Sequence, residues 1–106
     1  MKVFEIDGRA FKDYEGFVRE LYQQFNTTFP VSGLDRLDDV LYGGVIGFEE
    51  GEEVTIIWKN NQKSKKRLNR DKSIILDDSA GGLYRVIIDM IREHDNIHLQ
   101  LDDVDI

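Results

Sequence analysis

Three short segments of the chain have hydrophobic patterns that predict β-strands. Residues 3–6 (VFEI) form the first, which ends at the turn pair Asp7-Gly8. Residues 54–58 (VTIIW) are apolar almost without alternation, which is typical of a strand covered on both faces. Residues 97–101 (IHLQL) alternate, so the third strand is expected to have one apolar and one solvent-exposed face.

Three other segments repeat apolar residues at helical spacing. The first covers residues 14–25 and has Asp13 as its N-cap. The second is short, covers residues 34–41 and is ended by Gly43-Gly44. The last covers residues 79–94, and the positions expected to be buried in it are Leu83, Val86, Ile87, Met90 and Ile91.

The region between the second strand and the last helix gives a weaker signal. Residues 59–72 are strongly basic and are predicted to be part helix and part loop. Residues 73–76 fit either a short strand or a buried loop, and Asp77 and Asp78 are expected to cap the last helix. The resulting order of elements predicts an α/β fold, in which right-handed crossovers build a small parallel sheet packed with helices.

The composition fits one globular domain that covers residues 1–106. Hydrophobic residues make up 41% of the chain, there is one proline, and the absence of cysteine excludes disulfides and thiolate chemistry. We find no signal peptide at the start and no apolar stretch near the ~20 residues that span a bilayer. A cytoplasmic protein with no membrane association is therefore expected.

The charges are unevenly distributed. The net charge is −7, but residues 59–72 hold seven Lys or Arg and one acidic residue, a local +6, so the remainder carries −13. This balance argues against a general nucleic-acid binder and favours a basic partner. A solvated acidic surface that only keeps the protein soluble is the alternative. Nucleic-acid binding through residues 59–72 is a third hypothesis, and we expect instead that this segment is only solvated and charged.

Nothing in the sequence supports an enzyme. His94 and His98 are the only histidines, and their spacing implies no catalytic partner. Phosphate-binding glycine loops, HExxH and GxSxG are absent, and the acidic pairs lack the spacing of a calcium loop. We expect no catalytic residue, no metal and no cofactor.

The short helix carries the most informative pattern. At about 100° per residue, its apolar residues form a stripe on one side, while Asp35 and Asp39 point together from the opposite side. Asp38 lies at the border. Because carboxylates one turn apart repel each other, folding gains nothing from the pair, and a binding role is plausible. The alternative for Asp35 is that an acid in the first turn simply complements the helix dipole.

At these residues the chain resembles the barstar family, whose members are intracellular inhibitors of secreted bacterial ribonucleases. The matching pattern is Leu34-Asp35-x-Leu37-x-Asp39-x-Leu41-x-Gly43. The first strand with Asp7-Gly8, the helix with Phe17 and Leu21, the strand that ends in Trp58, and the last helix leading into residues 97–99 also match. The resemblance spans most of the chain except residues 63–78, which form a longer segment than in the family.

The resemblance implies a three-stranded parallel sheet with about four helices, and a protein that blocks a ribonuclease active site. It implies that Asp35 and Asp39 mimic RNA phosphates, with Phe29 as an aromatic contact on the preceding loop. It places Asp89 as an acid on the last helix, where pairing with Arg85 or Arg92 is the structural alternative. The expected partner-binding residues are Phe29, Leu34, Asp35, Asp38, Asp39, Gly43 and Asp89.

The chain departs from the family pattern at three places, the first being Val31-Ser32-Gly33, where a glycine and an asparagine are usual. Asp38 and Gly44 stand where the family often has tryptophans, and aromatic anchors usually dominate interface energy. Asp38 is expected to supply a third charge toward a different basic target.

The predicted function is that of a cytosolic inhibitor of a basic secreted ribonuclease, of the immunity or antitoxin type. The protein is expected to be a monomer when free and to bind no nucleic acid. The alternative is an acidic binding module for a partner that is not a ribonuclease.

Overall fold

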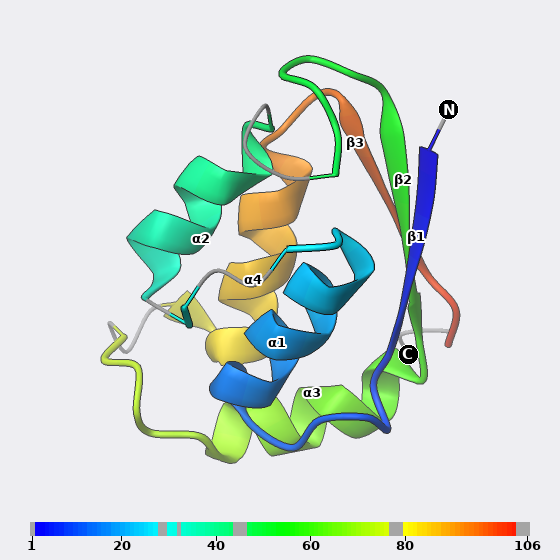
Figure 1. The fold of residues 1–106 in the computed structure, drawn as a ribbon. Coiled ribbons are helices and arrows are strands. Elements are labelled where there is room, and N and C mark those ends of the chain that lie inside the picture. Colours follow the sequence, from blue (N-terminus) through cyan, green and yellow to red (C-terminus); the bar gives the residue numbers. More distant parts are fainter. Residues whose placement is uncertain (1, 28–29, 32, 44–46, 77–79, 104–106) are drawn as a thin grey trace.

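The computed structural model describes residues 2–27, 30–31, 33–43, 47–76 and 80–103. Three parallel strands form a sheet in the order β1-β2-β3, which confirms the predicted α/β fold (Figure 1). The strands are β1 (Lys2–Asp7), β2 (Val54–Lys59) and β3 (Ile97–Leu101). The helices are α1 (Tyr14–Gln24), α2 (Leu34–Leu41), α3 (Asn61–Arg70) and α4 (Leu83–Arg92).

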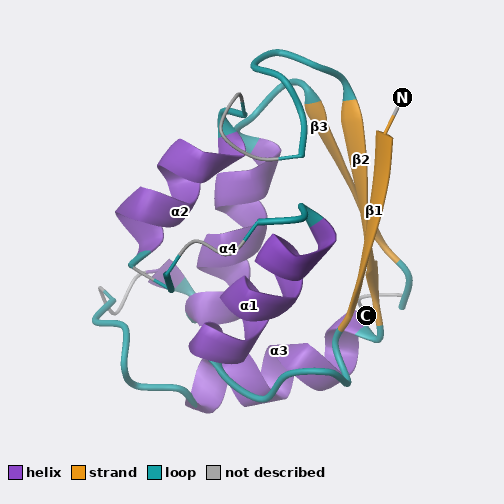
Figure 2. Cartoon of the chain, viewed as in Figure 1, coloured by secondary structure: helices purple, strands orange, loops and turns teal. Residues whose placement is uncertain are grey.

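All four described helices lie on one side of the sheet, where α1 and α4 contact the strands and α2 packs against α4 farther out (Figure 2). Trp58 of β2 is fully buried in the core, where its ring stacks on Phe17 of α1 at 5.2 Å and meets Tyr84 of α4 edge-on at 5.3 Å. Aromatic contacts of this kind add to the free energy of area burial. The middle strand therefore ties α1 and α4 together.

Strand β2 is covered on both faces, as its apolar run predicted, although the described helices lie on only one of them (Figure 1). Thr55 and Ile57 point to the other face, where Thr55 is buried and Ile57 is half-buried. Thr55 is paired with Val3 of β1 and His98 of β3, so side chains of the two flanking strands shield the outer face of the middle strand.

The first two helices confirm the sequence prediction. Asp13 is the N-cap of α1, and its carboxylate accepts the Gly16 N–H at 2.8 Å. Helix α2 has the predicted bounds and buries its apolar stripe. After α2, Gly43 has a φ of +87°, and a Cβ there would lie 2.8 Å from the Glu49 carbonyl oxygen. Only glycine fits this turn without strain.

The region from α3 to α4 differs more from the prediction. The basic segment forms α3 and then a loop, as expected, whereas residues 73–76 form no strand and are not fully buried. Helix α4 begins at Leu83 rather than near residue 79, because Gly81 and Gly82 have φ values of +83° and +98°. Its buried residues also differ, since Val86 and Met90 are only half-buried and Tyr84 and Ile88 are buried instead. The predicted capping residues Asp77 and Asp78 lie outside the described residues.

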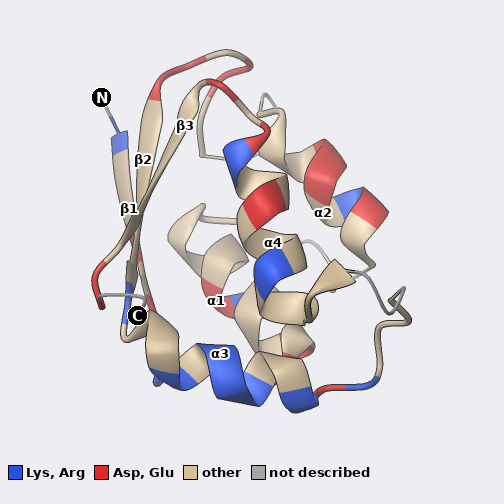
Figure 3. Ribbon diagram, turned by 180° about the vertical axis from the view of Figure 1, so that it is seen from behind, with Lys and Arg blue, Asp and Glu red and all other residues tan. Residues whose placement is uncertain are grey.

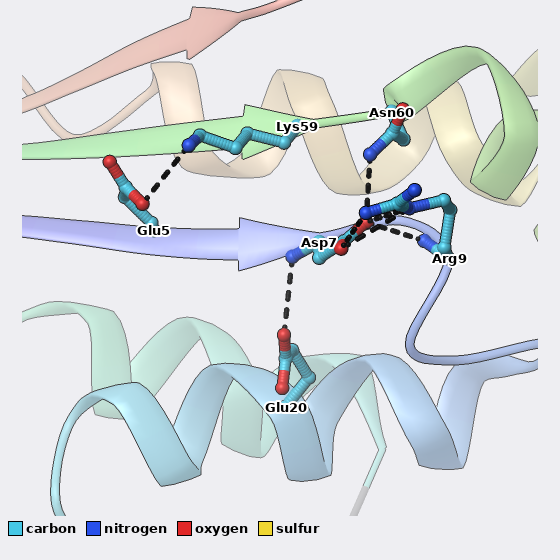
Figure 4. A network of polar contacts seen from close by, with 6 residues as sticks. All are labelled: Glu5, Asp7, Arg9, Glu20, Lys59 and Asn60. Carbon is cyan, nitrogen blue, oxygen red and sulfur yellow. Dashed lines mark hydrogen bonds and ion pairs between the residues drawn. The ribbon is translucent and has the colours of Figure 1, made fainter.

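A polar network fixes the end of β1 (Figure 4). The Asp7 carboxylate accepts hydrogen bonds from the Arg9 guanidinium at 3.1 Å, the Arg9 N–H at 2.9 Å and the Asn60 amide at 2.9 Å. These bonds, the guanidinium first, lower the pKa of Asp7 to about 2. The Asp7 N–H donates to Glu20 of α1 at 3.1 Å, so the network connects the strand to α1 and to the residue after β2.

Candidate partner-binding site

Helix α2 presents two carboxylates to solvent. Leu37, Val40 and Leu41 are buried on the other side of the helix, with exposed fractions of 0%, 4% and 0%. Asp35 and Asp39 are exposed, and within the described part of the chain neither carboxylate makes a hydrogen bond or an ion pair. The core holds the helix while both charges remain available to a partner.

Asp38 behaves differently from its two neighbours. Its carboxylate lies 2.8 Å from Nε2 of His94, which directly follows the C-cap of α4. The His94 side chain is 5% exposed and the Asp38 side chain 36% exposed. Asp38 therefore attaches α2 to the end of α4, and its expected role as a third charge toward a partner stays a prediction.

The remaining predicted site residues have diverse surroundings. Asp89 is exposed and pairs with Arg85 one turn earlier at 3.3 Å, the structural alternative raised by the sequence. Leu34 is half-buried against the core, and Gly43 forms the turn after α2. Phe29 lies outside the described residues.

The structure also identifies two exposed apolar residues beside the acidic face that the sequence reasoning missed. Tyr42, the C-cap of α2, is 56% exposed, and Ile75, in the loop after α3, is 96% exposed. The spacing Asp35, Asp39, Tyr42 (i, i+4, i+7) could have identified the tyrosine as part of the same helix face. Ile75 lies in an irregular segment, so no periodicity marks its direction.

Charge is segregated along the molecule (Figure 3). Lys and Arg residues cluster on α3, while acidic residues lie on α2 and in the turn of residues 49–53 before β2. Helix α3 is thus the basic end of the molecule, and α2 belongs to the acidic part. A cationic partner would be attracted to α2 and repelled by α3.

Other types of site find no support in the described residues. No group of three or more His, Cys, Asp or Glu side chains there could hold a metal ion. No described helix is long and apolar enough to cross a membrane. Two exposed carboxylates on a helix whose other side is buried make the acidic face of α2 the candidate site.

Comparisons with known proteins give one result, at the level of the family. No curated protein and no solved structure matches the chain. A family model described as Barstar (barnase inhibitor) matches residues 1–79, about three quarters of the chain. The matched range contains β1, α1, α2, β2 and α3, including the whole acidic face of α2, while Asp89 lies beyond it. The chain belongs to the barstar family of ribonuclease inhibitors.

Proposed function

We propose that this protein inhibits a basic secreted ribonuclease by inserting the acidic face of α2 into the enzyme's active site. The observation that carries the proposal is the pair Asp35 and Asp39, exposed and unpaired within the described chain, on a helix whose opposite side is buried. Family membership supports the same activity. The protein would act in the cytoplasm of the producing cell, as an immunity protein against its own toxin.

The chemistry of the target explains why carboxylates suit this task. A ribonuclease binds RNA phosphates with cationic side chains, and an exposed carboxylate offers the same charge and two hydrogen-bond acceptors. Asp35 and Asp39 are one helical turn apart, so their Cβ atoms are about 5–6 Å from each other. Two negative groups at this separation would occupy neighbouring phosphate positions.

Rigid support strengthens the interaction. The two carboxylates lie on a regular helix whose apolar residues are buried and whose Asp38 is bonded to His94. A preorganised surface loses little conformational entropy when it binds. The inhibitor would thus present its charges with little rearrangement.

An inhibition assay tests the proposal. RNA cleavage is measured with two enzymes, barnase and the secreted ribonuclease purified from culture fluid of the source organism, while the protein is titrated to excess. We expect at least one enzyme to be inhibited with 1:1 stoichiometry. Cleavage that continues undiminished with both enzymes would contradict the proposal.

Variants then locate the surface. Asp35→Asn and Asp39→Asn should each weaken binding by about 2–5 kcal/mol, a range that measurements on this family's own complexes helped to establish. Asp102→Asn is the matched control, because Asp102 is exposed directly after β3, on another element than α2, and its substitution removes the same charge. Equal losses in all three variants would indicate a general charge effect instead of a defined site.

The alternative partner is a basic protein that is not a ribonuclease. The absence of tryptophan at Asp38 and Gly44 favours it, because the family's frequent aromatic contacts are missing there. Failure of the ribonuclease assay together with Asp35-dependent binding to a different basic toxin would support this alternative.

A further inference from the structure

Two exposed apolar side chains lie at opposite ends of the acidic helix. In the described part of the chain the large hydrophobic residues that are exposed are Val3, Tyr42 and Ile75, at 55%, 56% and 96%. Val3 lies on the outer face of the sheet, away from the helices. Tyr42 ends α2, and Ile75 lies beside its beginning. Single exposed apolar residues are common, but two that border one charged face call for an explanation.

Tyr42 continues the stripe that Asp35 and Asp39 begin. Its backbone is still helical, with φ −66° and ψ −20°, so the i, i+4, i+7 spacing places its side chain on the same side of α2. The edge of its ring contacts the ring of His94, with centroids 4.7 Å apart at 76°. This contact holds the tyrosine on one side and leaves more than half of it open to solvent.

Ile75 shares a surface hollow with Asp35. The hollow has a volume of about 570 Å³ and lies between the start of α2 and residues 73–75. Its apolar lining consists of Leu34, Ile74 and Ile75. In Figure 1 the loop after α3 extends from that helix toward the start of α2. Asp35 and Ile75 therefore face one common space.

The loop that carries Ile75 is anchored on both sides of this residue. The Asp71 carboxylate accepts the N–H groups of Tyr14 at 2.8 Å and Ser73 at 2.9 Å. Ile74 and Leu76 pack against the core. The outward position of Ile75 thus follows from fixed neighbours.

We propose that Tyr42 and Ile75 are the apolar anchors of the partner-binding surface, one at each end of the acid pair. This inference rests on the proposed function and adds the chemistry of the partner: a cationic cleft with an apolar patch on each side. Charges mainly set the rate and selectivity of association, whereas desolvated apolar anchors slow dissociation. The loop after α3 supplies one anchor, and the end of α2 supplies the other.

Charge argues against a second copy of this chain as the occupant. A symmetric contact through this face would bring Asp35 and Asp39 of one copy against the same residues of the other. Like charges that face each other at an interface are unfavourable. The apolar lining of the hollow also suits a protein better than a nucleic acid, whose phosphates the two aspartates would repel.

Binding kinetics with whichever ribonuclease the inhibition assay identifies, barnase being the first probe, test this inference. The variants are Ile75→Ser and Tyr42→Ser, with Val3→Thr as the control for an exposed apolar residue on another face. We expect both variants to dissociate about 10-fold faster or more, with an unchanged association rate and an unchanged salt dependence. Val3→Thr should match the wild type. Thermal unfolding of Ile75→Ser should also match it, because the side chain is exposed.

The other outcomes are distinct. If both serine variants dissociate at the wild-type rate while Asp35→Asn weakens binding, the anchor role is wrong and the proposed function stands. If the wild type binds neither enzyme, the proposed function fails and the anchor role fails with it. If sedimentation shows a wild-type dimer that Ile75→Ser converts to a monomer, the occupant is a second copy and the inference is overturned.

Discussion

The carboxylate of Asp38 lies 2.8 Å from the buried ring nitrogen Nε2 of His94. This bond joins two residues that are 56 positions apart and connects α2 to the residue that follows the end of α4. Asp38, at the border of the apolar stripe of α2, therefore has a structural role. The two neighbouring aspartates on α2 remain exposed.

Removal of this attachment should destabilise the protein. Asp38→Ala leaves the buried His94 without its partner, so the free energy of unfolding should fall by about 1–3 kcal/mol. Urea unfolding, followed by the fluorescence of the single, buried Trp58, measures the change. Asp39→Ala is the matched control, because its carboxylate has no partner in the described chain and its loss should not lower stability. Equal losses in both variants would disprove the structural role of Asp38.

Inhibitor association should depend strongly on salt. In the proposed function the acidic surface of α2 would attract a cationic enzyme over long range, and ions screen such an attraction beyond about 10 Å at 0.1 M salt. Stopped-flow measurements should therefore show an association rate that falls about 10-fold or more from low to physiological ionic strength. The double variant Asp35→Asn, Asp39→Asn should show a flatter dependence. An association rate of the wild type that does not respond to salt would rule out electrostatic steering.

Stability should fall in acid partly through Asp7. Its folded-state pKa of about 2 lies below the ordinary aspartate value of 3.8, because Arg9 and Asn60 bond to the ionised carboxylate. A lowered pKa contributes stability that is fully present above about pH 4 and is lost as the pH falls toward 2. The free energy of unfolding, plotted against pH between pH 2 and 5, should thus change less steeply for Asp7→Asn than for the wild type. If the free energies of unfolding of the two proteins change equally with pH, Asp7 does not contribute to the loss of stability in acid.

The turn after α2 should tolerate no side chain at Gly43. With a φ of +87° and the Glu49 carbonyl oxygen 2.8 Å from the added Cβ, Gly43→Ala should cost about 1–3 kcal/mol of stability. Gly33→Ala is the comparison at the other end of the helix, since φ there is −69° and nothing lies within 4 Å of a Cβ. Thermal unfolding of both variants measures the difference. A Gly43→Ala variant as stable as Gly33→Ala would mean that the turn adapts.

Local patterns predicted the fold where local physics decides it. The bounds of α2 follow from apolar residues at helical spacing and from glycine after the end, and these signals lie within ten residues of each other. The predicted start of α4 was wrong because Gly81 and Gly82 have positive φ, so the helix begins only after them. Its buried face was wrong in part because Tyr84 is placed by a distant partner, the Asn61 amide that donates to its hydroxyl at 2.8 Å.

The candidate site, too, was predictable only where local helical geometry decides the direction of a side chain. Helical geometry identified Asp35 and Asp39 as a pair that faces outward, and the structure exposes both. The partner of Asp38 could not be found, because a contact between α2 and the end of α4 depends on how the two helices pack. The exposure of Ile75 could not be predicted either, because an apolar residue in a loop is equally consistent with burial.

The separation of basic α3 from acidic α2 has a consequence before any contact forms. In the electric field of a cationic enzyme such a molecule experiences a torque, which turns its negative side toward the enzyme and its positive end away. Collisions would then occur more often in the productive orientation than chance allows. The basic helix would thereby aid recognition without touching the partner.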